Sequence, residues 1–123
     1  MNLNRSVQIL QELTAHGVED FCVCAGARNA PLVKALHHAQ GIHVYNFFDE
    51  RSAAFFALGV AKRKKAPAVV VTTSGTAVAE LLPAVVEAHY SGVPLVLLTA
   101  DRPPQYRHSG APQSIKQIGF FSH

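Results

Sequence analysis

The sequence has no tryptophan, one methionine and two cysteines among its 123 residues. No apolar stretch approaches the ~20 residues that a membrane-spanning helix needs, so we expect no membrane association. Residues 1–13 are amphipathic and do not place an apolar core behind a basic patch, so we expect no signal peptide. Repeats, linkers and low-complexity tracts are also lacking. These absences favour a cytoplasmic protein of one domain.

The two cysteines, Cys22 and Cys24, alternate within a short apolar run. On a strand, both side chains would point to the same face. A disulfide between residues two positions apart has poor geometry, and two ligands are too few for a structural zinc site. We therefore expect two buried free thiols, as is usual in a cytosolic protein.

Positive charge is only weakly in excess, with a net charge of +3. The one basic cluster, at residues 62–65, follows an apolar pattern of helical spacing and precedes Pro67. A helix C-terminus stabilised by its dipole explains such a cluster. A nucleic-acid patch is the alternative, but no aromatic residues interleave with the charges. We expect no nucleic-acid partner.

Apolar residues make up 49% of the chain, which predicts a compact domain with a substantial core. Their periodicity predicts alternating helices and strands. The expected helices span residues 5–16, 31–39, 50–64 and 76–90, with a short one at 113–117, and the expected strands span residues 21–25, 42–48, 68–72 and 95–99. Pro83 would kink the helix at 76–90. Strands that are apolar on both faces predict a three-layer α/β/α domain with a parallel sheet.

Polar residues gather in the loops that would follow the four strands. In an open parallel sheet these loops meet at one edge, where ligands bind. The loops are residues 25–29, 48–51, 73–76 and 100–103. They contain a pair of carboxylates, arginines from separate loops and a glycine turn leading into a helix. Because arginine forks bind carboxylates bidentately, this set predicts a site for an anionic small molecule.

Each of these residues also has a structural explanation. Asp49 can cap the helix that follows it, and Glu50 can favour the dipole of that helix. Residues 74–76 fit a tight turn with an N-cap and match neither a Walker loop nor a dinucleotide fingerprint. Arg28 and Arg102 can be ordinary surface residues. No histidines have the spacing of metal ligands with a carboxylate partner, so we expect no metal site in this chain.

Five motifs nevertheless occur in an order that resembles a known family. They are CAGARNAPL at 24–32, FDER at 48–51, VTTSGTAVA at 71–79, LTADRPP at 98–104 and GAPQSIKQ at 110–117. Together they resemble the N-terminal part of the 2-succinyl-5-enolpyruvyl-6-hydroxy-3-cyclohexene-1-carboxylate synthases, thiamine-diphosphate enzymes of menaquinone biosynthesis. The similarity covers nearly the whole chain.

The resemblance implies that residues 1–123 are a pyrimidine-binding domain of the thiamine-diphosphate type. It implies that Glu50 hydrogen-bonds N1′ of the cofactor's aminopyrimidine and so acts in catalysis, where it must share a proton with that nitrogen. It also implies that a set of small and hydroxyl residues binds the cofactor, namely Gly26, Ser74, Gly75 and Thr76.

The resemblance further implies that Arg28, Arg102 and Gln113 face an isochorismate pocket, where two arginines would suit a dicarboxylate. Two positions depart from the family. Ala27 stands where the family commonly has serine, and Pro112 stands where it commonly has asparagine. Both changes remove a side-chain hydrogen-bond donor next to the implied substrate.

For a whole protein, the resemblance implies a transferase that decarboxylates 2-oxoglutarate and adds the succinyl-semialdehyde unit to isochorismate. The family's diphosphate-binding module, which holds Mg²⁺ or Mn²⁺, is absent from the sequence. The chain also ends at IGFFSH with no strand after its apolar residues. We therefore expect a fragment of a longer chain that is inactive alone. Because the family's cofactor lies between subunits, we expect a homo-oligomer, dimeric or tetrameric.

Two other functions remain open on the residues alone. The domain can belong to another thiamine-diphosphate carboligase or decarboxylase, which joint consumption of 2-oxoglutarate and isochorismate would distinguish. It can also be a non-catalytic module that binds small anions or partner proteins. A native product of this chain's own mass would favour the non-catalytic module.

Overall fold

Helices and parallel strands alternate along the chain in the computed structural model, which describes residues 2–106 and 108–122. The elements are α1 (Leu3–Ala15), β1 (Asp20–Val23), α2 (Ala30–His38), β2 (His43–Asn46), α3 (Glu50–Lys64), β3 (Ala68–Thr72), α4 (Thr76–Ala79), α5 (Leu82–Ser91), β4 (Leu95–Thr99) and the 3-10 turn η1 (Pro104–Tyr106). The alternation predicted from the sequence is therefore present.

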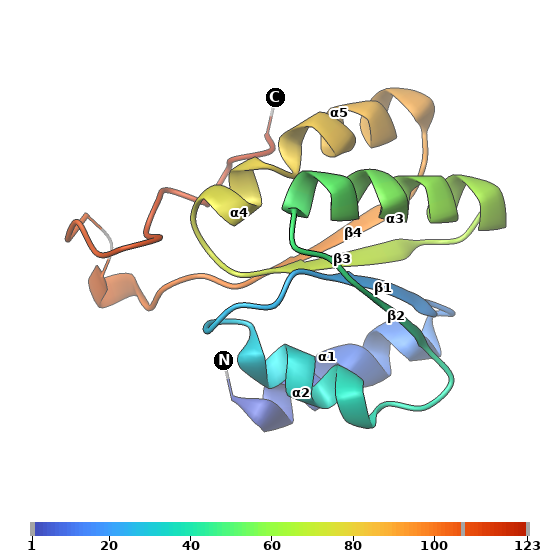
Figure 1. The fold of residues 1–123 in the computed structure, drawn as a ribbon, viewed down its shortest axis with the longest axis horizontal. Helices are drawn as coiled ribbons and strands as arrows, with labels where there is room; N and C mark the ends of the chain where they lie inside the picture. The colour runs from blue at the N-terminus through green and yellow to red at the C-terminus, as the bar shows by residue number, and fades with distance from the viewer. Residues whose placement is uncertain (1, 107, 123) are drawn as a thin grey trace.

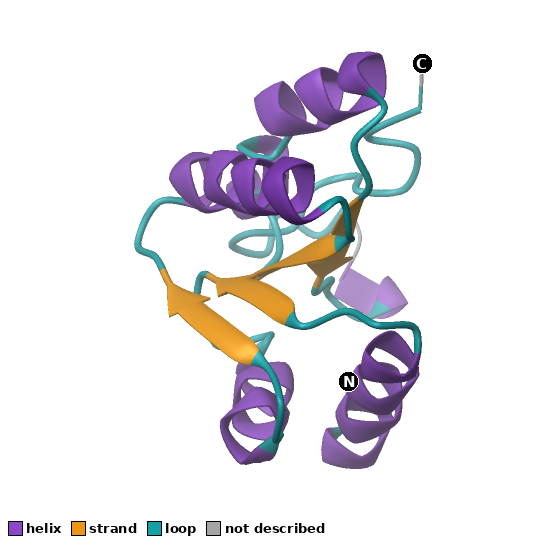
Figure 2. Cartoon of the chain, turned by 90° about the vertical axis from the view of Figure 1, so that its right-hand side faces the viewer, coloured by secondary structure: helices purple, strands orange, loops and turns teal. Residues whose placement is uncertain are grey.

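The four strands form one parallel sheet in the order β2-β1-β3-β4. Figure 1 shows α1 and α2 on one face of this sheet and α3, α4 and α5 on the other. Figure 2 shows the same three layers from the side. The prediction of a three-layer α/β/α domain with a parallel sheet is confirmed.

The core divides into two halves because successive strand residues point to opposite faces. β1 and β3 lie in the centre and are buried along their whole length. Cys22 and Val70 pack on the side of α3, whereas Phe21 and Val69 pack on the side of α1 and α2. Both cysteines are free and buried, as expected, and burial raises the pKa of each thiol to about 12.

The sheet edges are less covered than the sequence predicts. β4 is half-buried and β2 is mostly exposed, with Val44 at 40% exposure. The expectation that every strand is apolar and covered on both faces is wrong for β2, because it is an edge strand with a neighbour on one side only. The chain leaves β2 earlier than predicted, and Phe48 is fully exposed.

α3 begins and ends as its sequence predicts. The Asp49 carboxylate accepts a hydrogen bond from the backbone N–H of Ser52 at 2.7 Å and caps the first turn. Lys65 ends the helix in the left-handed conformation, with φ of 55°. Among the described helices, none combines the length and the apolar character needed to cross a bilayer.

Two predicted helices differ from the structure. The helix expected at 76–90 is divided into α4 and α5, and Pro83 lies in the first turn of α5, where its missing N–H costs no hydrogen bond. The short helix expected at 113–117 is wrong. Gln113 has a φ of 56°, which is incompatible with a right-handed helix, and residues 114–117 have no regular structure.

Candidate functional site

The loops that follow all four strands lie at the carboxyl edge of the sheet, as expected for a parallel α/β domain. Figure 1 shows the chain after β4 returning along this edge, past the turn between β3 and α4. Residues 111–117 of this return, called the strap below, contact the loops that follow β1, β3 and β4.

A buried asparagine shapes the loop after β1. The Asn29 amide donates to the Cys24 carbonyl at 2.9 Å, and its carbonyl oxygen accepts from the Gly26 N–H at 2.7 Å. Asn29 is fully buried. Asn29 is not among the predicted site residues, although an asparagine just before the helix that starts near Pro31 is a signal for such a turn.

A glycine is required at position 26 because the backbone there lies very close to the Thr73 side chain. A Cβ atom on Gly26 would lie 2.7 Å from the Thr73 Cβ, so no other residue fits without movement. The Thr73 hydroxyl is buried and makes no hydrogen bond within the described residues. This places an unpaired polar group directly beside Gly26.

Glu50 is the first residue of α3 and is half-buried. Its carboxylate makes no hydrogen bond or ion pair with any residue that the structure describes, in contrast to Asp49 beside it. After burial, the negative charges of Glu50 and Asp49 add to the raised pKa of Cys24 at the end of β1. Glu50 is therefore a half-buried acid, near the end of β1, whose carboxylate is available to a ligand.

The strap is fixed to the turn after β3 by hydrogen bonds. The Ser74 hydroxyl donates to the Gln113 carbonyl at 2.7 Å, and the Gly75 N–H donates to the Gln117 side chain at 3.0 Å. The Gln117 amide in turn donates to the Ala100 carbonyl at 3.0 Å. The turn with an N-cap expected at residues 74–76 is present, with Gly75 as the N-cap of α4 and no side-chain cap hydrogen bond.

Glycine at position 75 is also needed for this contact. Gly75 has a φ of +83°, and a Cβ atom there would lie 2.8 Å from the Gln113 Cα. The positive φ disfavours any residue with a side chain, and the short distance leaves no room for a Cβ atom unless the strap moves.

Two arginines converge on the strap. Arg102 donates from Nε and Nη2 to the Pro112 carbonyl at 2.9 and 2.8 Å, and Arg28 donates from Nη2 to the same oxygen at 3.2 Å. The other Arg28 nitrogen, Nη1, donates to the Gln113 side-chain oxygen at 2.9 Å. The Arg102 guanidinium also lies 5.5 Å from the centre of the Tyr106 ring. Neither guanidinium forms an ion pair with a carboxylate of the described residues.

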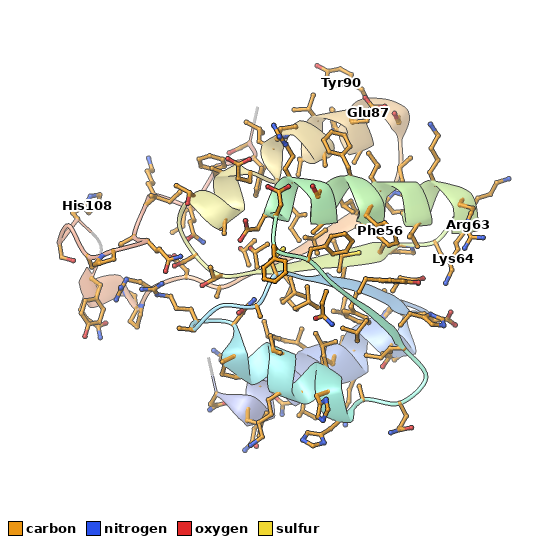
Figure 3. All side chains as sticks on the ribbon, viewed as in Figure 1. Phe56, Arg63, Lys64, Glu87, Tyr90 and His108 are labelled. Atoms are coloured by element: carbon orange, nitrogen blue, oxygen red, sulfur yellow. The ribbon has the colours of Figure 1, made fainter. Side chains whose placement is uncertain are left out.

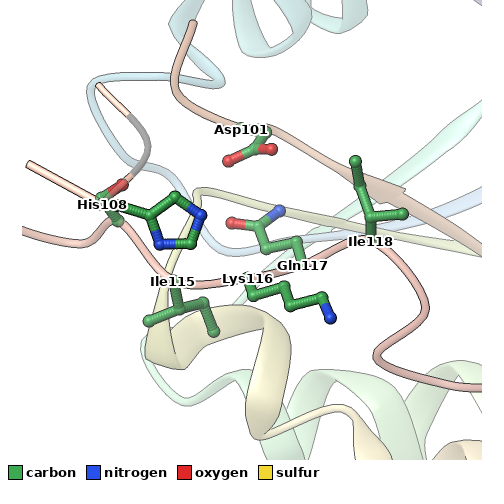
Figure 4. A pocket seen from close by; sticks show the side chains of 7 residues that line it. Asp101, His108, Ile115, Lys116, Gln117 and Ile118 are labelled. Atoms are coloured by element: carbon green, nitrogen blue, oxygen red, sulfur yellow. The ribbon is translucent and has the colours of Figure 1, made fainter. Parts of the chain in front are cut away.

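A cavity of about 400 Å³ lies alongside the strap, lined by Asp101, His108 and residues 114–118. Figure 4 shows the Asp101 and Gln117 side chains at this cavity, the first from the loop after β4 and the second from the strap. Glu50 and Gly26 do not line it. The cavity therefore borders the strap and is separate from the candidate acid.

The opposite, amino edge of the sheet holds a cluster of possible metal ligands. Glu19, Asp20 and His43 offer ligand atoms within 4.8 Å of one another. This group is not predicted from the sequence, because Asp20 and His43 meet only through the register of β1 and β2. The Lys64 ammonium lies 2.6 Å from Asp20 and supplies positive charge at the same carboxylate, so the cluster is an ion-pair network.

The structure thus gathers five of the predicted site residues, Arg28, Ser74, Gly75, Arg102 and Gln113, into one hydrogen-bonded network. Gly26 joins the same edge through its contact with Thr73. Glu50 and the exposed Thr76 stand at that edge without side-chain hydrogen bonds to described residues. Gln117 had no signal in the sequence, because its role depends on a contact over 42 positions.

The chain is a three-layer α/β/α domain with polar side chains at the carboxyl edge of its parallel sheet, the edge at which domains of this class place their ligands. Comparison with known protein families identifies the family within the α/β class to which the chain belongs. The family described as thiamine pyrophosphate enzyme, N-terminal TPP binding domain, matches residues 4–120. The chain belongs to this family.

Several relatives share one name, 2-succinyl-5-enolpyruvyl-6-hydroxy-3-cyclohexene-1-carboxylate synthase. The protein from Bdellovibrio bacteriovorus is 54% identical over 122 residues, which are 99% of this chain and 23% of that protein. The protein from Chloroflexus aurantiacus is 58% identical over 92% of this chain and 19% of its own length. The protein from Halobacterium salinarum is 56% identical over 89% of this chain and 19% of its own length. The chain therefore spans about a fifth of the length of these relatives.

Proposed function

We propose that residues 1–123 are the pyrimidine-binding domain of a longer synthase that decarboxylates 2-oxoglutarate and adds the succinyl-semialdehyde unit to isochorismate. Two observations support the proposal. The relatives that carry this name match the chain at 49–58% identity, and Glu50 lies at the carboxyl edge as a half-buried acid with no hydrogen-bond or ion-pair partner among the described residues. The second observation is the one on which the chemistry depends.

The residues at this edge fit thiamine diphosphate. The aminopyrimidine of the cofactor has ring nitrogens that need a proton donor or acceptor, and the free carboxylate of Glu50 is of that chemical type. Among the small residues at the same edge, Thr76 is exposed, whereas Gly26 and Gly75 pack against Thr73 and Gln113 and Ser74 is buried. Thr76 could therefore contact the cofactor directly, and the other three would shape the loops beside it. When bound, the cofactor supplies a thiazolium carbon that attacks a 2-oxo acid and stabilises the charge left by decarboxylation.

Glu50 would share a proton with N1′ of the aminopyrimidine and so act as an acid–base catalyst through the ring. Its position supports this role. The helix that starts at Glu50 is already capped by Asp49, so Glu50 is not required for the first turn. A half-buried carboxylate is also more strongly coupled to a bound ring than an exposed one.

Arg28, Arg102 and Gln113 would bind the carboxylates of isochorismate. The two guanidinium groups meet at one carbonyl oxygen and form no ion pair with a carboxylate of the described residues, so two positive charges lie close together here. A dicarboxylate complements it. Ala27 and Pro112 supply no side-chain donor there, which leaves binding to the arginines and Gln113.

The diphosphate site and its Mg²⁺ or Mn²⁺ would lie outside this chain, in a C-terminal domain of a second subunit of a cytoplasmic homo-oligomer. Within the described residues, the only group of three metal-type ligands is the cluster around Asp20, which already pairs with Lys64. Residues 1–123 alone should therefore be inactive. Calorimetry of this fragment should detect no tight, magnesium-dependent binding of thiamine diphosphate.

The decisive experiment uses the full-length protein. With thiamine diphosphate and Mg²⁺, 2-oxoglutarate and isochorismate should be consumed together, with release of carbon dioxide. Glu50→Gln should lower kcat by about 100-fold or more, since acid–base catalysis contributes roughly 10² to 10⁴. Glu12→Gln, at an exposed position of α1, is the matched control and should retain normal turnover.

A normal turnover rate of the Glu50→Gln variant would show that Glu50 is not a catalytic residue. Decarboxylation of 2-oxoglutarate or another 2-oxo acid without consumption of isochorismate would favour a different thiamine-diphosphate carboligase or decarboxylase. Absence of any cofactor binding by the full-length protein would favour a non-catalytic module.

A further inference from the structure

Gln117, the last residue of the strap, bridges two of the loops at the carboxyl edge of the sheet. We propose that Gln117 is a positioning residue for substrate binding: it fixes the strap, and the strap holds Arg28 and Arg102 in the orientation that binds the substrate carboxylates. The inference rests on the proposed function, in which these two arginines bind isochorismate.

The amide of Gln117 makes one hydrogen bond with each of the two loops. Its oxygen accepts from the Gly75 N–H at 3.0 Å, in the turn after β3, and its nitrogen donates to the Ala100 carbonyl at 3.0 Å, directly after β4. Both partner residues are buried, and one planar amide supplies the acceptor and the donor that they need. Among the described residues, Gln117 makes no hydrogen bond to either arginine, so any effect on them must pass through the strap.

The strap is fixed along its length by further contacts. The Ser74 hydroxyl donates to the Gln113 carbonyl at 2.7 Å, and the Ser114 hydroxyl donates to the Tyr106 carbonyl at 3.2 Å. The backbone of Gly75 also packs on Gln113, since an added Cβ atom would lie 2.8 Å from the Gln113 Cα. These contacts and the amide bridge at its last residue make the strap a fixed element of the site.

The strap in turn sets the positions of the two guanidinium groups. The Pro112 carbonyl accepts from Nε and Nη2 of Arg102 at 2.9 and 2.8 Å and from Nη2 of Arg28 at 3.2 Å. The Gln113 side chain accepts from Nη1 of Arg28 at 2.9 Å. Because like charges repel, these shared acceptors stabilise guanidiniums that lie side by side. Each guanidinium has five N–H groups and gives two of them to the strap, so three remain for a ligand.

Arginines that are already held in place bind a dicarboxylate at a lower cost. An arginine side chain loses rotamer freedom when it binds a ligand, and less is lost when the protein has fixed the side chain beforehand. Loss of the Gln117 bridge should therefore weaken substrate binding without altering the chemistry at Glu50. The expected signature is a raised KM for isochorismate at an unchanged kcat.

Steady-state kinetics of the full-length protein, with thiamine diphosphate and Mg²⁺, tests this signature. Gln117→Met keeps the length of the side chain and removes both hydrogen bonds. It should raise the KM for isochorismate by about threefold to tenfold, with kcat unchanged. Gln40→Met, the same change at an exposed position, is the matched control and should leave both constants unchanged. A lower kcat at an unchanged KM would mean that Gln117 serves only the stability of the fold, and would overturn the proposal.

Gln117→Asn tests the same contacts with a smaller change. Asparagine keeps the amide but is one methylene shorter, so it reaches one of the two backbone partners and not both. The KM of this variant should lie between the values of the wild type and of Gln117→Met. A wild-type KM in Gln117→Asn would overturn the proposal, whether or not Gln117→Met folds.

A double-mutant cycle shows whether Gln117 acts through an arginine. Arg102→Met alone should raise the KM for isochorismate by about tenfold or more, because hydrogen bonds from a charged group are lost. In the Arg102→Met background, Gln117→Met should raise the KM by a smaller factor than in the wild type, since only Arg28 is left to orient. Equal factors in the two backgrounds would overturn the role of Gln117 and leave the substrate in place. An unchanged KM in Arg102→Met would contradict the proposed function and this inference with it.

Calorimetry with succinate separates the role of Gln117 from the identity of the substrate. Succinate is a plain dicarboxylate that needs only the two arginines. Its dissociation constant should rise by about threefold to tenfold in Gln117→Met and should not change in Gln40→Met. This result in a protein that does not consume isochorismate would support the inference and contradict the proposed substrate. An unchanged dissociation constant in Gln117→Met, or no succinate binding by the wild type, would overturn the inference.

Discussion

The charged residues at the two edges of the sheet differ in whether they have partners of opposite charge among the described residues. At the amino edge, Asp20 is buried and its carboxylate contacts the Lys64 ammonium at 2.6 Å, the Tyr45 hydroxyl at 3.2 Å and the His43 ring at 3.4 Å. At the carboxyl edge, Glu50 has no partner among the described residues, and two arginines share one neutral carbonyl. Figure 3 shows Lys64 at the far end of α3, the helix that Glu50 begins.

The difference separates residues that stabilise the fold from residues that, in the proposed function, bind a ligand. A buried acid must be paired, since an unpaired buried charge is costly. The amino edge satisfies this rule within the chain. The carboxyl edge leaves charges and one buried hydroxyl, that of Thr73, unsatisfied by the described residues, which is the pattern of a binding site.

The largest stability effect is expected at the amino edge. Asp20→Asn should lower the free energy of unfolding by about 2–3 kcal/mol, below the ~3–5 kcal/mol of a fully buried broken pair, because water still reaches Lys64. Chemical denaturation of the isolated domain measures this change. Glu12→Gln, which alters the exposed Glu12–His16 pair, should cause no measurable loss. Equal losses in the two variants would contradict a special role for the amino edge.

A steric substitution tests the packing of the carboxyl edge. Gly26→Ala should destabilise the domain by about 1–3 kcal/mol, because its Cβ would lie 2.7 Å from the Thr73 Cβ. Gly59→Ala, in the middle of α3 with nothing within 4 Å of its added Cβ, is the control and should be neutral or stabilising. A neutral Gly26→Ala variant would show that this loop moves freely away from Thr73.

The two neighbouring carboxylates at the start of α3, Asp49 and Glu50, should differ in how much they contribute to thermal stability. Asp49→Ala removes the cap to Ser52 and should lower the midpoint of thermal unfolding by about 4 °C. Glu50→Ala makes the same change one residue later, where no hydrogen bond is lost, and should shift the midpoint by less than about 2 °C. A larger shift for Glu50→Ala would make Glu50 a structural residue and weaken its assignment as a ligand-binding acid.

The last effect appears only at alkaline pH. The pKa of each of Cys22 and Cys24 is raised from 9.0 to about 12, first by burial and then by nearby carboxylates. A raised pKa in the folded state means stability that is complete below pH 9 and is lost as pH rises from 9 towards 12. The pKa of Lys64 is also raised, first by its hydrogen bond to Asp20, and the pKa of Tyr45 is raised first by burial and then by its hydrogen bond to Asp20.

Urea unfolding at a series of pH values measures this alkaline loss. The midpoint should fall above pH 9, and Cys24→Ala should make the fall shallower because one thiol no longer titrates. A midpoint that stays constant up to pH 11 would mean that the thiols are not buried in solution.

Much of the fold was predictable because it depends on local pattern. The apolar runs of β1 and β3, the Asp49 cap and the basic end of α3 all follow from neighbouring residues. The prediction of a helix at 113–117 is wrong because this segment depends on contacts with distant parts of the chain. That segment is held by Arg28, Ser74 and Arg102, none of which is near it in the chain, and these contacts overrode the local tendency to form a helix.

Residue type and spacing alone predict the parallel α/β class, the buried thiols and the motif order that resembles the synthase family. Which acid has a partner among the described residues depends instead on contacts between segments that are distant in the chain. Asp20 meets His43 through strand register and Lys64 through packing of α3, whereas Glu50 meets no partner among the described residues. The arginines meet at Pro112 for the same reason: contacts over 84 and 10 positions form only when the chain has folded.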